Sequence, residues 1–574
     1  MAPWGIARPA AASAGAGYHE ALFVPHMPMT PASGTLRANL VQVMERRIAA
    51  GRVAWEDGIL TDFEMDGAED PSLGYLIPGF VDAHVHIESA MLVPSEFARL
   101  ASRHGTVATV SDPHEIANVL GIEGVRFMLA NARRAPLKMF FGAPSCVPAT
   151  GFETAGAELG LAELEILLRR EGLLYLSEMM NYPAVLAGDP IVLAKITLAR
   201  DLGLPVDGHA PGLTGERARR YAEAGISTDH ECTSLAEAHD KIAAGMSILI
   251  REGSAARDFE ALHPLVSSHP DRVMFCSDDK HPDDLARGHI DRLAARAVAS
   301  GHDPFDVLRC ACVNPVLHYR LPVGLLRPGD PMDAALVADL RDFRPLRTWV
   351  DGRLVAEDGR SHIERVAVEP VNRFRAGRLE PERLRVPAGP GLLRVIDALD
   401  GELLTREILL PPRIEQGAVV PDPARDILYL AVLNRYREAP PALAFVRGFG
   451  LRRGALASSV AHDSHNIVAV GTDADSLCQA VNALVERGGG IALAEDGGVD
   501  CLPLPVAGLM STEDGDQVAA RYADLTRRAR ALGSPLRSPF MTLSFMALLV
   551  IPELKLSDRG LFDGRGFRFT GVMA

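Results

Sequence analysis

The sequence predicts an α/β protein centred on a TIM-like (β/α)₈ barrel, with a small flanking β-sandwich and an additional C-terminal α/β domain. Three observations support this prediction. Short apolar runs alternate with amphipathic stretches from Val81 to Asp279, which is typical of repeated βα units and a parallel sheet. Ionisable residues recur where these apolar runs end. Short β segments with glycine turns lie on both sides of the region.

Length and composition limit the kind of protein. A chain of 574 residues is too long for one hydrophobic core, so we expect several domains. The net charge of −15 argues against a nucleic-acid partner and against an anionic membrane surface. Seven scattered cysteines form no disulfide framework, and no apolar run is long enough for a membrane span. We therefore expect a cytoplasmic protein.

The expected domains follow changes in composition along the chain. The first residues are rich in Ala, Gly and Pro and are interpreted as an extension, not a signal peptide. Two β segments that bracket the barrel are expected to pair with each other. The domains are an N-terminal extension (1–33), a small β-sandwich (34–76 and 325–370), the barrel (77–324), a Pro- and Arg-rich linker (371–392) and a C-terminal domain (393–574).

Eight candidate strands support the barrel. In barrels of this kind the chemistry lies at the carboxyl ends of the strands, so polar residues at those ends are candidate site residues. The candidate strands are Leu76–Val85, Thr106–Val110, Lys138–Gly142, Leu173–Ser177, Pro205–Asp207, Gly225–Thr228, Met246–Ile250 and Arg272–Cys276.

The end of the first candidate strand carries the strongest chemical signal. His84 and His86 are two residues apart, so both side chains project to the same side of a strand. Two neutral imidazoles at one strand end form half of a first-row metal site. The alternative is a pair of core histidines whose ring nitrogens are hydrogen-bonded within the protein. The acids and histidines further along the chain favour a metal site instead.

Other strand ends complete a candidate binuclear centre of four imidazoles and two carboxylates. His84, His86 and Asp278 fit one metal, His209 and His230 fit a second, and Glu178 fits a bridge between them. Mixed nitrogen and oxygen ligands suit zinc, manganese or iron(II). Two such metals lower the pKa of a shared water, and Asp278 is placed to transfer its proton. This combination predicts hydrolysis at a polar carbon–nitrogen or carbonyl centre.

Longer motifs resemble the bacterial adenine deaminase family of the amidohydrolase superfamily. They include PGFVDAHVHIESAMLVPSEFA, SDPHEIANVLG, DGHAPGL, FCSDDKHPDDL and, further on, GFGLRRGALASSVAHDSHNIVAVG. The resemblance covers the chain from about Leu36 to near its end. It implies a metal-dependent hydrolase barrel that converts adenine and water to hypoxanthine and ammonia in purine salvage. It also implies two divalent ions, with manganese or iron favoured over zinc.

The resemblance assigns the same ligands, with one departure from many superfamily members. Those members bridge their metals with a carboxylated lysine on the fourth strand, whereas this chain has Glu178 there. Lys195 falls in the following helix. The resemblance therefore implies that Glu178 bridges the metals and that Asp278 acts at the eighth strand.

Further polar residues are candidates for substrate binding. Asp112, His114 and Glu115 follow the second strand and are expected to face the pocket. Glu88 is interpreted in three ways: it orients a histidine, it contacts the substrate, or it is an exposed polar residue without a role in the site. Residues Arg251 and Asp279 are candidates for hydrogen bonds to a purine edge or for holding loops.

The polar segment 462–466 (His-Asp-Ser-His-Asn) has three interpretations. It fits another metal site, a contact that reaches the active site, or a hydrogen-bonded turn; a turn or an interface is favoured because the segment has two histidines and no cysteine.

Two other functions remain open at this stage. One is hydrolysis of another cyclic amidine or amide base, because superfamily sites share their chemistry and differ in pocket contacts. The other is an inactive barrel that serves as a binding protein, which would be free to lose ligands. The expected assembly is a homo-oligomer, either a dimer or a larger assembly.

Overall fold

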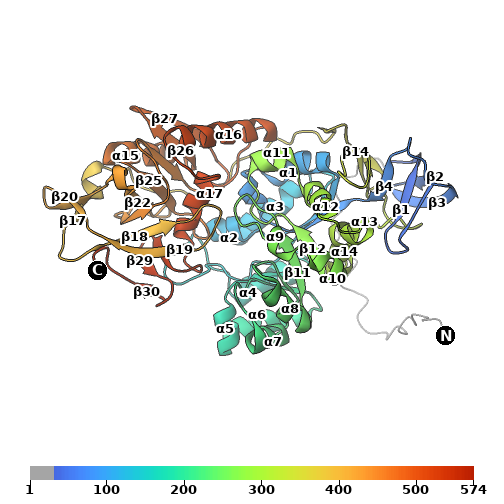
Figure 1. Cartoon of the computed structure of the whole chain (residues 1–574), viewed down its shortest axis with the longest axis horizontal. Coiled ribbons are helices and arrows are strands. Elements are labelled where there is room, and N and C mark those ends of the chain that lie inside the picture. Colours follow the sequence, from blue (N-terminus) through green and yellow to red (C-terminus); the bar gives the residue numbers. More distant parts are fainter. Residues whose placement is uncertain (1–31) are drawn as a thin grey trace.

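The computed structural model describes residues 32–574, and residues 1–31 of the expected N-terminal extension lie outside the described residues. The molecule is elongated, with three parts in a row (Figure 1). A sheet containing the first strands lies at one end, a region of strands and helices lies in the middle, and the C-terminal region lies at the other end. Between residues 32 and 574, no helix is long and apolar enough to cross a membrane.

The flanking sheet has eight strands and combines two distant parts of the chain. Its strand order is β16-β15-β14-β13-β4-β1-β2-β3, with β4 and β13 paired antiparallel. One face packs around Trp55 and Trp349, whose rings lie 6.2 Å apart edge to face. The strands are β1 (Gly34–Gln42), β2 (Arg47–Glu56), β3 (Ile59–Gly67), β4 (Tyr75–Pro78), β13 (Ala334–Val337), β14 (Pro345–Val350), β15 (Arg353–Glu357) and β16 (Arg360–Ser361).

The prediction of one continuous strand over Leu76–Val85 is wrong. The chain leaves the flanking sheet at the end of β4 and enters the central region as β5 (Phe80–Val85). Gly79 marks the break, because its N–H donates to the carbonyl of Asp333 at 3.1 Å while the next N–H turns to Gly105 at 3.0 Å. A Cβ at Gly79 would lie 2.1 Å from a methyl carbon of Val107, so only glycine fits this crossing.

The central region contains eight parallel strands. They form the sheets β5-β6-β7, β8-β9 and β10-β11-β12. Contacts between edge strands link the sheets: for example, Ala143 bridges Leu176, the N–H of Ser227 donates to the carbonyl of Val206 at 2.8 Å, and Val85 bridges Asp278. The remaining strands are β6 (Thr106–Ser111), β7 (Lys138–Phe141), β8 (Leu176–Met179), β9 (Val206–Gly208), β10 (Thr228–Asp229), β11 (Ser247–Arg251) and β12 (Val273–Cys276).

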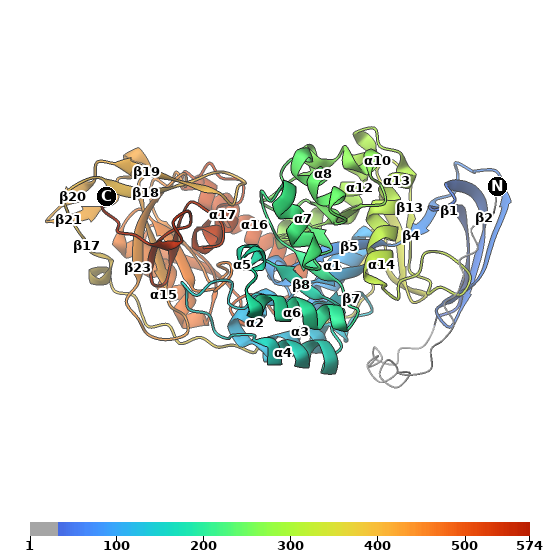
Figure 2. The same ribbon diagram turned by 90° about the horizontal axis from the view of Figure 1, so that it is seen from below.

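Helices alternate with these strands and lie around them in Figure 2. Their starts carry clear sequence signals: the Asp189 carboxylate caps α6 directly before a proline, and the Ser234 hydroxyl caps α8. The helices are α1 (Pro94–Ala101), α2 (His114–Leu120), α3 (Ile122–Ala132), α4 (Leu161–Glu165), α5 (Tyr182–Ala187), α6 (Pro190–Asp201), α7 (Gly215–Glu223), α8 (Leu235–Ala243), α9 (Phe259–Leu262), α10 (Leu265–Ser268), α11 (Pro282–Arg287), α12 (Ile290–Ala299), α13 (Pro304–Leu308) and α14 (Asn314–Tyr319).

The C-terminal region is built on a sheet of order β19-β18-β23-β22-β25-β24-β26-β27. Its main strands are β18 (Leu393–Ala398), β19 (Thr405–Leu410), β22 (Leu428–Leu433), β23 (Ala442–Arg447), β24 (Ala455–Ser458), β25 (Ile467–Gly471), β26 (Gly490–Glu495) and β27 (Gly498–Pro503). Smaller strands are β17 (Val386–Pro387), β20 (Arg413–Glu415), β21 (Ala418–Val420), β28 (Leu554–Ser557), β29 (Gly560–Asp563) and β30 (Arg568–Phe569).

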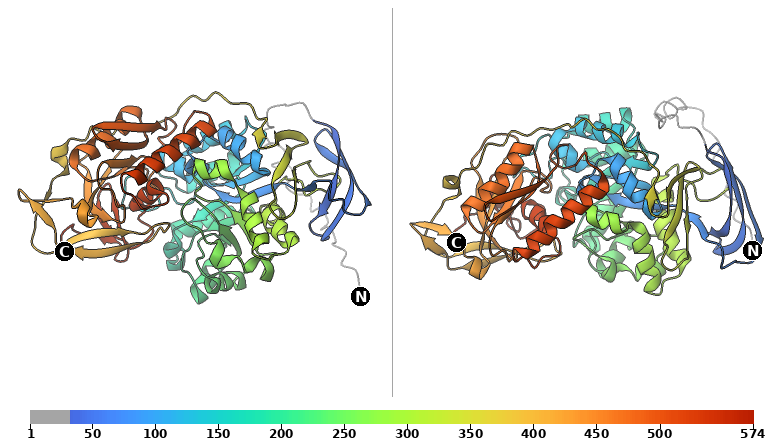
Figure 3. Two further views of the ribbon diagram at one scale, coloured as in Figure 1. Left: turned by 45° about the horizontal axis from the view of Figure 1, so that its top comes forward. Right: turned by 90° about the horizontal axis from the view of Figure 1, so that it is seen from above.

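Both faces of this sheet are buried, and one of them joins the core of the central region. Ala457 and Ala469 pack under α15 (Ala474–Arg487), while Leu456 and Val468 point to the opposite face and share a core with the central strands. Helices α16 (Gly515–Ala531) and α17 (Pro539–Ser544) complete the region. In Figure 3 the long red helix α16 reaches from the C-terminal region to the blue and green helices α1 and α11. The two parts are therefore packed together.

Candidate active site

Three of the predicted metal ligands meet at the end of β5. The Nε2 atoms of His84 and His86 lie 3.1 Å apart. The Oδ1 atom of Asp278 lies 3.1 Å from Nε2 of His86 and 3.5 Å from Nε2 of His84. All three side chains are buried. The ends of β5 and β12, the first and last strands of the central region, thus bring two imidazoles and one carboxylate to the same point.

Backbone contacts hold Asp278 in this position. Its N–H donates to the carbonyl of His84 at 2.9 Å, and its own carbonyl accepts from the N–H of His86 at 3.3 Å. The Asp278 backbone adopts φ +51°, a left-handed conformation that is uncommon outside glycine and recurs at functional sites. The end of β12 is therefore turned so that its carboxylate faces the β5 histidines.

Glu178 lies between the two predicted groups of histidines. Its Oε1 lies 3.4 Å from Nε2 of His86, while its Oε2 lies 2.6 Å from Nδ1 of His209 and 3.2 Å from Nε2 of His230. Burial alone would raise the pKa of the Glu178 carboxyl, but the His209 and His230 imidazoles outweigh it and lower this pKa well below its usual value. The two oxygens of one ionised carboxylate therefore face different histidines, which is the arrangement that a bridging ligand needs.

The donor set fits divalent cations. Nε2 atoms 3.1 Å apart can share at most one hydrogen, and carboxylate oxygens converge on the same buried space. Within residues 32–574, donor atoms that lie within 4.8 Å of one another form several groups, including His84–His230–Asp278 and Glu178–His209–His230. Imidazole nitrogens and carboxylate oxygens are ligands of first-row metals. The six predicted ligands are thus brought together.

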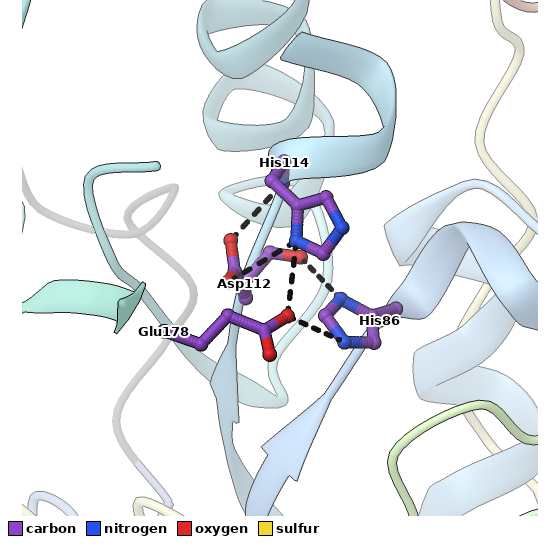
Figure 4. Close-up of side chains that lie close together, drawn as sticks. All are labelled: His86, Asp112, His114 and Glu178. Carbon is purple, nitrogen blue, oxygen red and sulfur yellow. Dashed lines mark hydrogen bonds and ion pairs between the residues drawn. The ribbon is translucent and has the colours of Figure 1, made fainter. Parts of the chain in front are cut away.

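Asp112 and His114 lie closer to the predicted ligands than their assignment to substrate binding suggests. Figure 4 shows both beside His86 and Glu178, and the four side chains form another candidate donor group. Nδ1 of His114 lies 3.3 Å from Oε1 of Glu178 and 3.2 Å from Oδ2 of Asp112. The backbone carbonyl of Asp112 accepts from Nδ1–H of His86 at 3.1 Å, which leaves Nε2 of His86 free to act as a ligand.

Arg251 and Asp279 differ in what they contact. Arg251 lines the pocket, but its guanidinium pairs with Asp278 at 2.9 Å, with Asp258 at 3.2 Å and with Glu231. It therefore holds the Asp278 carboxylate. Asp279 also lines the pocket, and its carboxylate accepts a hydrogen bond from the hydroxyl of Ser89 at 2.5 Å.

Glu88 lies beneath the start of α2 and is 2% exposed, so it is not an exposed polar residue. Its carboxylate accepts from the N–H of Ile116 at 3.2 Å, and burial raises its pKa to about 7. Among the described residues, those that line the pocket do not include Glu88.

The C-terminal region supplies part of the pocket wall. Its apolar lining residues could not be identified from the sequence, because isolated Leu, Phe and Val side chains are ordinary core residues. The C-terminal residues that line the pocket are Leu403, His462, Asp463, Phe545, Leu548 and Val550, and the central region adds Met180 and Glu231.

The polar segment 462–466 is a contact that reaches the active site. Nδ1 of His462 donates to one carboxylate oxygen of Glu115, and Nε2 of His465 donates to the other at 2.5 Å. Glu115 is buried at the start of α2. The interpretation as an interface therefore holds, and the histidines of this segment connect the C-terminal region to the edge of the pocket.

A buried lysine ties together two segments of the apolar wall. Nζ of Lys555 donates to the carbonyls of Leu403 at 2.6 Å and Phe545 at 2.9 Å. Burial lowers the pKa of Lys555 from 10.5 to about 7. A neutral amine has two hydrogens and thus satisfies both carbonyls.

We expect Lys555 to make stability rise with pH. The pKa of Lys555 is lower in the folded protein than in the unfolded chain, so the unfolded chain binds more protons between about pH 7 and 10.5. Wild-type protein should therefore gain up to about 1.4 kcal/mol per pH unit over Lys555→Met across this window. Urea unfolding at pH 7 and pH 9 measures this difference. Parallel pH profiles of the two proteins would contradict the expectation.

Comparisons with known proteins identify the family. The model of the amidohydrolase family matches residues 75–355, and that of the adenine deaminase C-terminal domain matches residues 402–568. The adenine deaminase of Salinibacter ruber is 58% identical, over 94% of this chain and 99% of its own length. Those of Sulfurovum sp. (53%, over 93% and 98%) and Methanosarcina barkeri (50%, over 94% and 99%) are also similar. The chain therefore belongs to the adenine deaminase family of the amidohydrolase superfamily.

Proposed function

We propose that this protein hydrolyses adenine to hypoxanthine and ammonia, as a step of purine salvage. The observation that carries the proposal is the convergence of four imidazoles and two carboxylates in one buried site whose wall includes the C-terminal region. Near full-length similarity to proteins named adenine deaminase supports the choice of adenine. An inactive binding protein would have no need to keep this complete donor set.

The proposed cofactors are two divalent ions, manganese or iron in preference to zinc. His84, His86 and Asp278 would hold one ion, His209 and His230 would hold the other, and Glu178 would contact both. When bound, such ions lower the pKa of water so that hydroxide is available at neutral pH. The preference for manganese or iron is carried by the family resemblance.

The proposed proton transfer depends on Asp278. The oxygen of water forms a bond to C6 of adenine while the electron pair of the C6=N1 double bond moves to N1, and Asp278 accepts a proton from that water. Asp278 then returns the proton to the C6 amino group, the C6=N1 double bond forms again, the bond between C6 and the amino nitrogen breaks, and ammonia leaves. The remaining hydroxyl proton moves to N1 to give hypoxanthine. Arg251 supports this role because it pairs with Oδ2 at 2.9 Å, while Oδ1 faces the histidines. Charge pairing of this kind keeps the carboxylate ionised and fixes its orientation.

The proposed architecture is a closed (β/α)₈ barrel over residues 77–324. The contacts between Val85 and Asp278, between Ala143 and Leu176, and between Ser227 and Val206 support closure, because they link the three parallel sheets. The flanking sheet (34–76 and 325–370), the linker (371–392) and the C-terminal domain (393–574) complete the proposed division. The proposed assembly is a homodimer, which sedimentation of the purified protein tests.

Ammonia release by purified, manganese-loaded protein tests the proposed function. We expect turnover of adenine, much slower release from adenosine, guanine and cytosine, and loss of activity with a chelator that manganese restores. Metal binding without turnover of adenine, together with turnover of another cyclic amidine, would replace adenine as the substrate. Protein that binds metal but acts on none of these bases would instead support a binding role.

A further inference from the structure

The pocket wall of the C-terminal region contains one polar ring in a fixed orientation. Nδ1 of His462 is bonded to Glu115, and the ring stacks on Phe545 with centroids 5.2 Å apart and an interplanar angle of 30°. Both contacts constrain the rotation of the His462 side chain. The ring is buried, with 3% of its residue surface exposed, and it lines the pocket.

The second carboxylate oxygen of Glu115 is also occupied. Nε2–H of His465 donates to it at 2.5 Å, while Nδ1 of His465 accepts from the N–H of Ala461 at 3.2 Å. Both oxygens of Glu115 thus hold imidazoles of the C-terminal region, so Glu115 has a role in orienting His462. His465 does not line the pocket as far as residues 32–574 are concerned.

The other ring nitrogen of His462 is unsatisfied. In the described part of the chain, its Nε2 is buried and has no hydrogen-bond partner. Oδ1 of Asp279 is 3.8 Å from this Nε2, which is too long for a hydrogen bond. Burial alone would lower the pKa of His462, but the Glu115 and Asp279 carboxylates outweigh it and raise this pKa to about 9, so both ring nitrogens carry a hydrogen at neutral pH. Buried polar atoms are normally paired, so this oriented Nε2–H, which faces the pocket, is suited to donate to a ligand atom.

We infer that His462 is a specificity-determining residue whose Nε2–H donates a hydrogen bond to a ring nitrogen of the substrate base, with Glu115 as its positioning residue. The inference rests on the proposed function. Once the metal side of the pocket holds C6 of a purine, the remaining polar atoms of adenine are ring nitrogens. Phe545 and Leu548 of the same wall supply apolar surface for the ring. A base without the matching nitrogen leaves Nε2 of His462 unpaired and binds less well.

Inhibition by 1-deazaadenine, 3-deazaadenine and 7-deazaadenine tests this contact, since each lacks one ring nitrogen. We expect wild-type enzyme to bind one of them about 10-fold more weakly than the other two, and His462→Leu to lose that discrimination. His462→Leu should also raise KM for adenine about 10-fold, change kcat less and keep two metal ions per chain. The decisive result is non-additivity: removing the His462 imidazole and one particular ring nitrogen together should weaken binding by less than the two separate losses combined.

His465→Leu is the matched control, because it removes the other imidazole on Glu115 without removing a pocket atom. It should weaken binding of all three analogues by the same factor and keep the discrimination. His462→Gln, which places an amide near the position of Nε2, should restore part of the discrimination and serves if His462→Leu does not fold. Equal weakening of all three analogues by both His462 variants would overturn the contact.

Failure of this inference is distinguishable from failure of the proposed function. If wild-type enzyme does not deaminate adenine, the proposed function fails whatever the His462 variants do. Suppose instead that wild-type enzyme deaminates adenine, and that for every analogue the loss of affinity from the His462 variant adds to the loss from the missing nitrogen. Only the assignment of His462 then fails.

Discussion

Glu178→Gln is expected to lose bound metal and activity together while the protein stays folded. The two carboxylate oxygens face different imidazoles, at 3.4 Å from His86 and at 2.6 Å from His209, so one substitution affects both proposed metal positions. An amide has one oxygen to offer and carries no charge. We expect turnover to fall by more than the roughly 10–100-fold that loss of an outer hydrogen-bond partner costs. Metal analysis and ammonia release, measured on the same sample, check this.

Glu123→Gln is the control for this prediction. Glu123 pairs with Arg126 on the surface of α3, with 76% of its side chain exposed, so its variant should keep both metals and normal turnover. Circular dichroism establishes that the Glu178 variant is folded. Two bound metals and full activity in Glu178→Gln would remove the bridging role.

Asp278→Asn is expected to keep most of the metal and to lose turnover. The four imidazoles and Glu178 remain as ligands, whereas the amide has no carboxylate oxygen to accept a proton. Loss of general acid–base catalysis typically costs 10²–10⁴-fold in rate, and we expect kcat to fall within about this range. Metal content and kcat for adenine are the two measurements.

The two readouts for Asp278→Asn separate its proposed roles. Near-normal kcat with full metal content would exclude Asp278 from proton transfer. Loss of bound metal together with a fall in kcat would show that Asp278 acts mainly as a metal ligand, because the missing metal would by itself explain the lower kcat.

Much of the central fold was predictable because its signals are local. The predicted strands 106–110 and 272–276 overlap β6 and β12, where apolar runs end in polar residues. The only sequence signal for dividing the segment 76–85 is its Pro78-Gly79 step, a dipeptide common in turns. Its apolar run continues through Gly79, and the division arises from contacts with Asp333 and Val107, which are distant in sequence.

The candidate site is likewise predictable from the sequence only in part. The spacing of His84 and His86 places both on one side of a strand, so their convergence follows from strand geometry. Leu403 and Phe545 line the same pocket, yet neither residue type indicates chemistry and both lie in the C-terminal region. Only the polar segment 462–466 gave a signal from that region, and the sequence left its partner Glu115 unidentified.

The distance in sequence between the two sides of the pocket has a consequence for synthesis on the ribosome. The last of the proposed metal ligands is residue 278, whereas the residues that cover the pocket extend to Val550. At usual elongation rates these final residues are added on the order of 15–50 s later. During this interval the nascent chain contains the proposed ligands but not the residues that cover the pocket. We therefore expect metal from the surrounding pool to reach the proposed ligands most easily before translation ends.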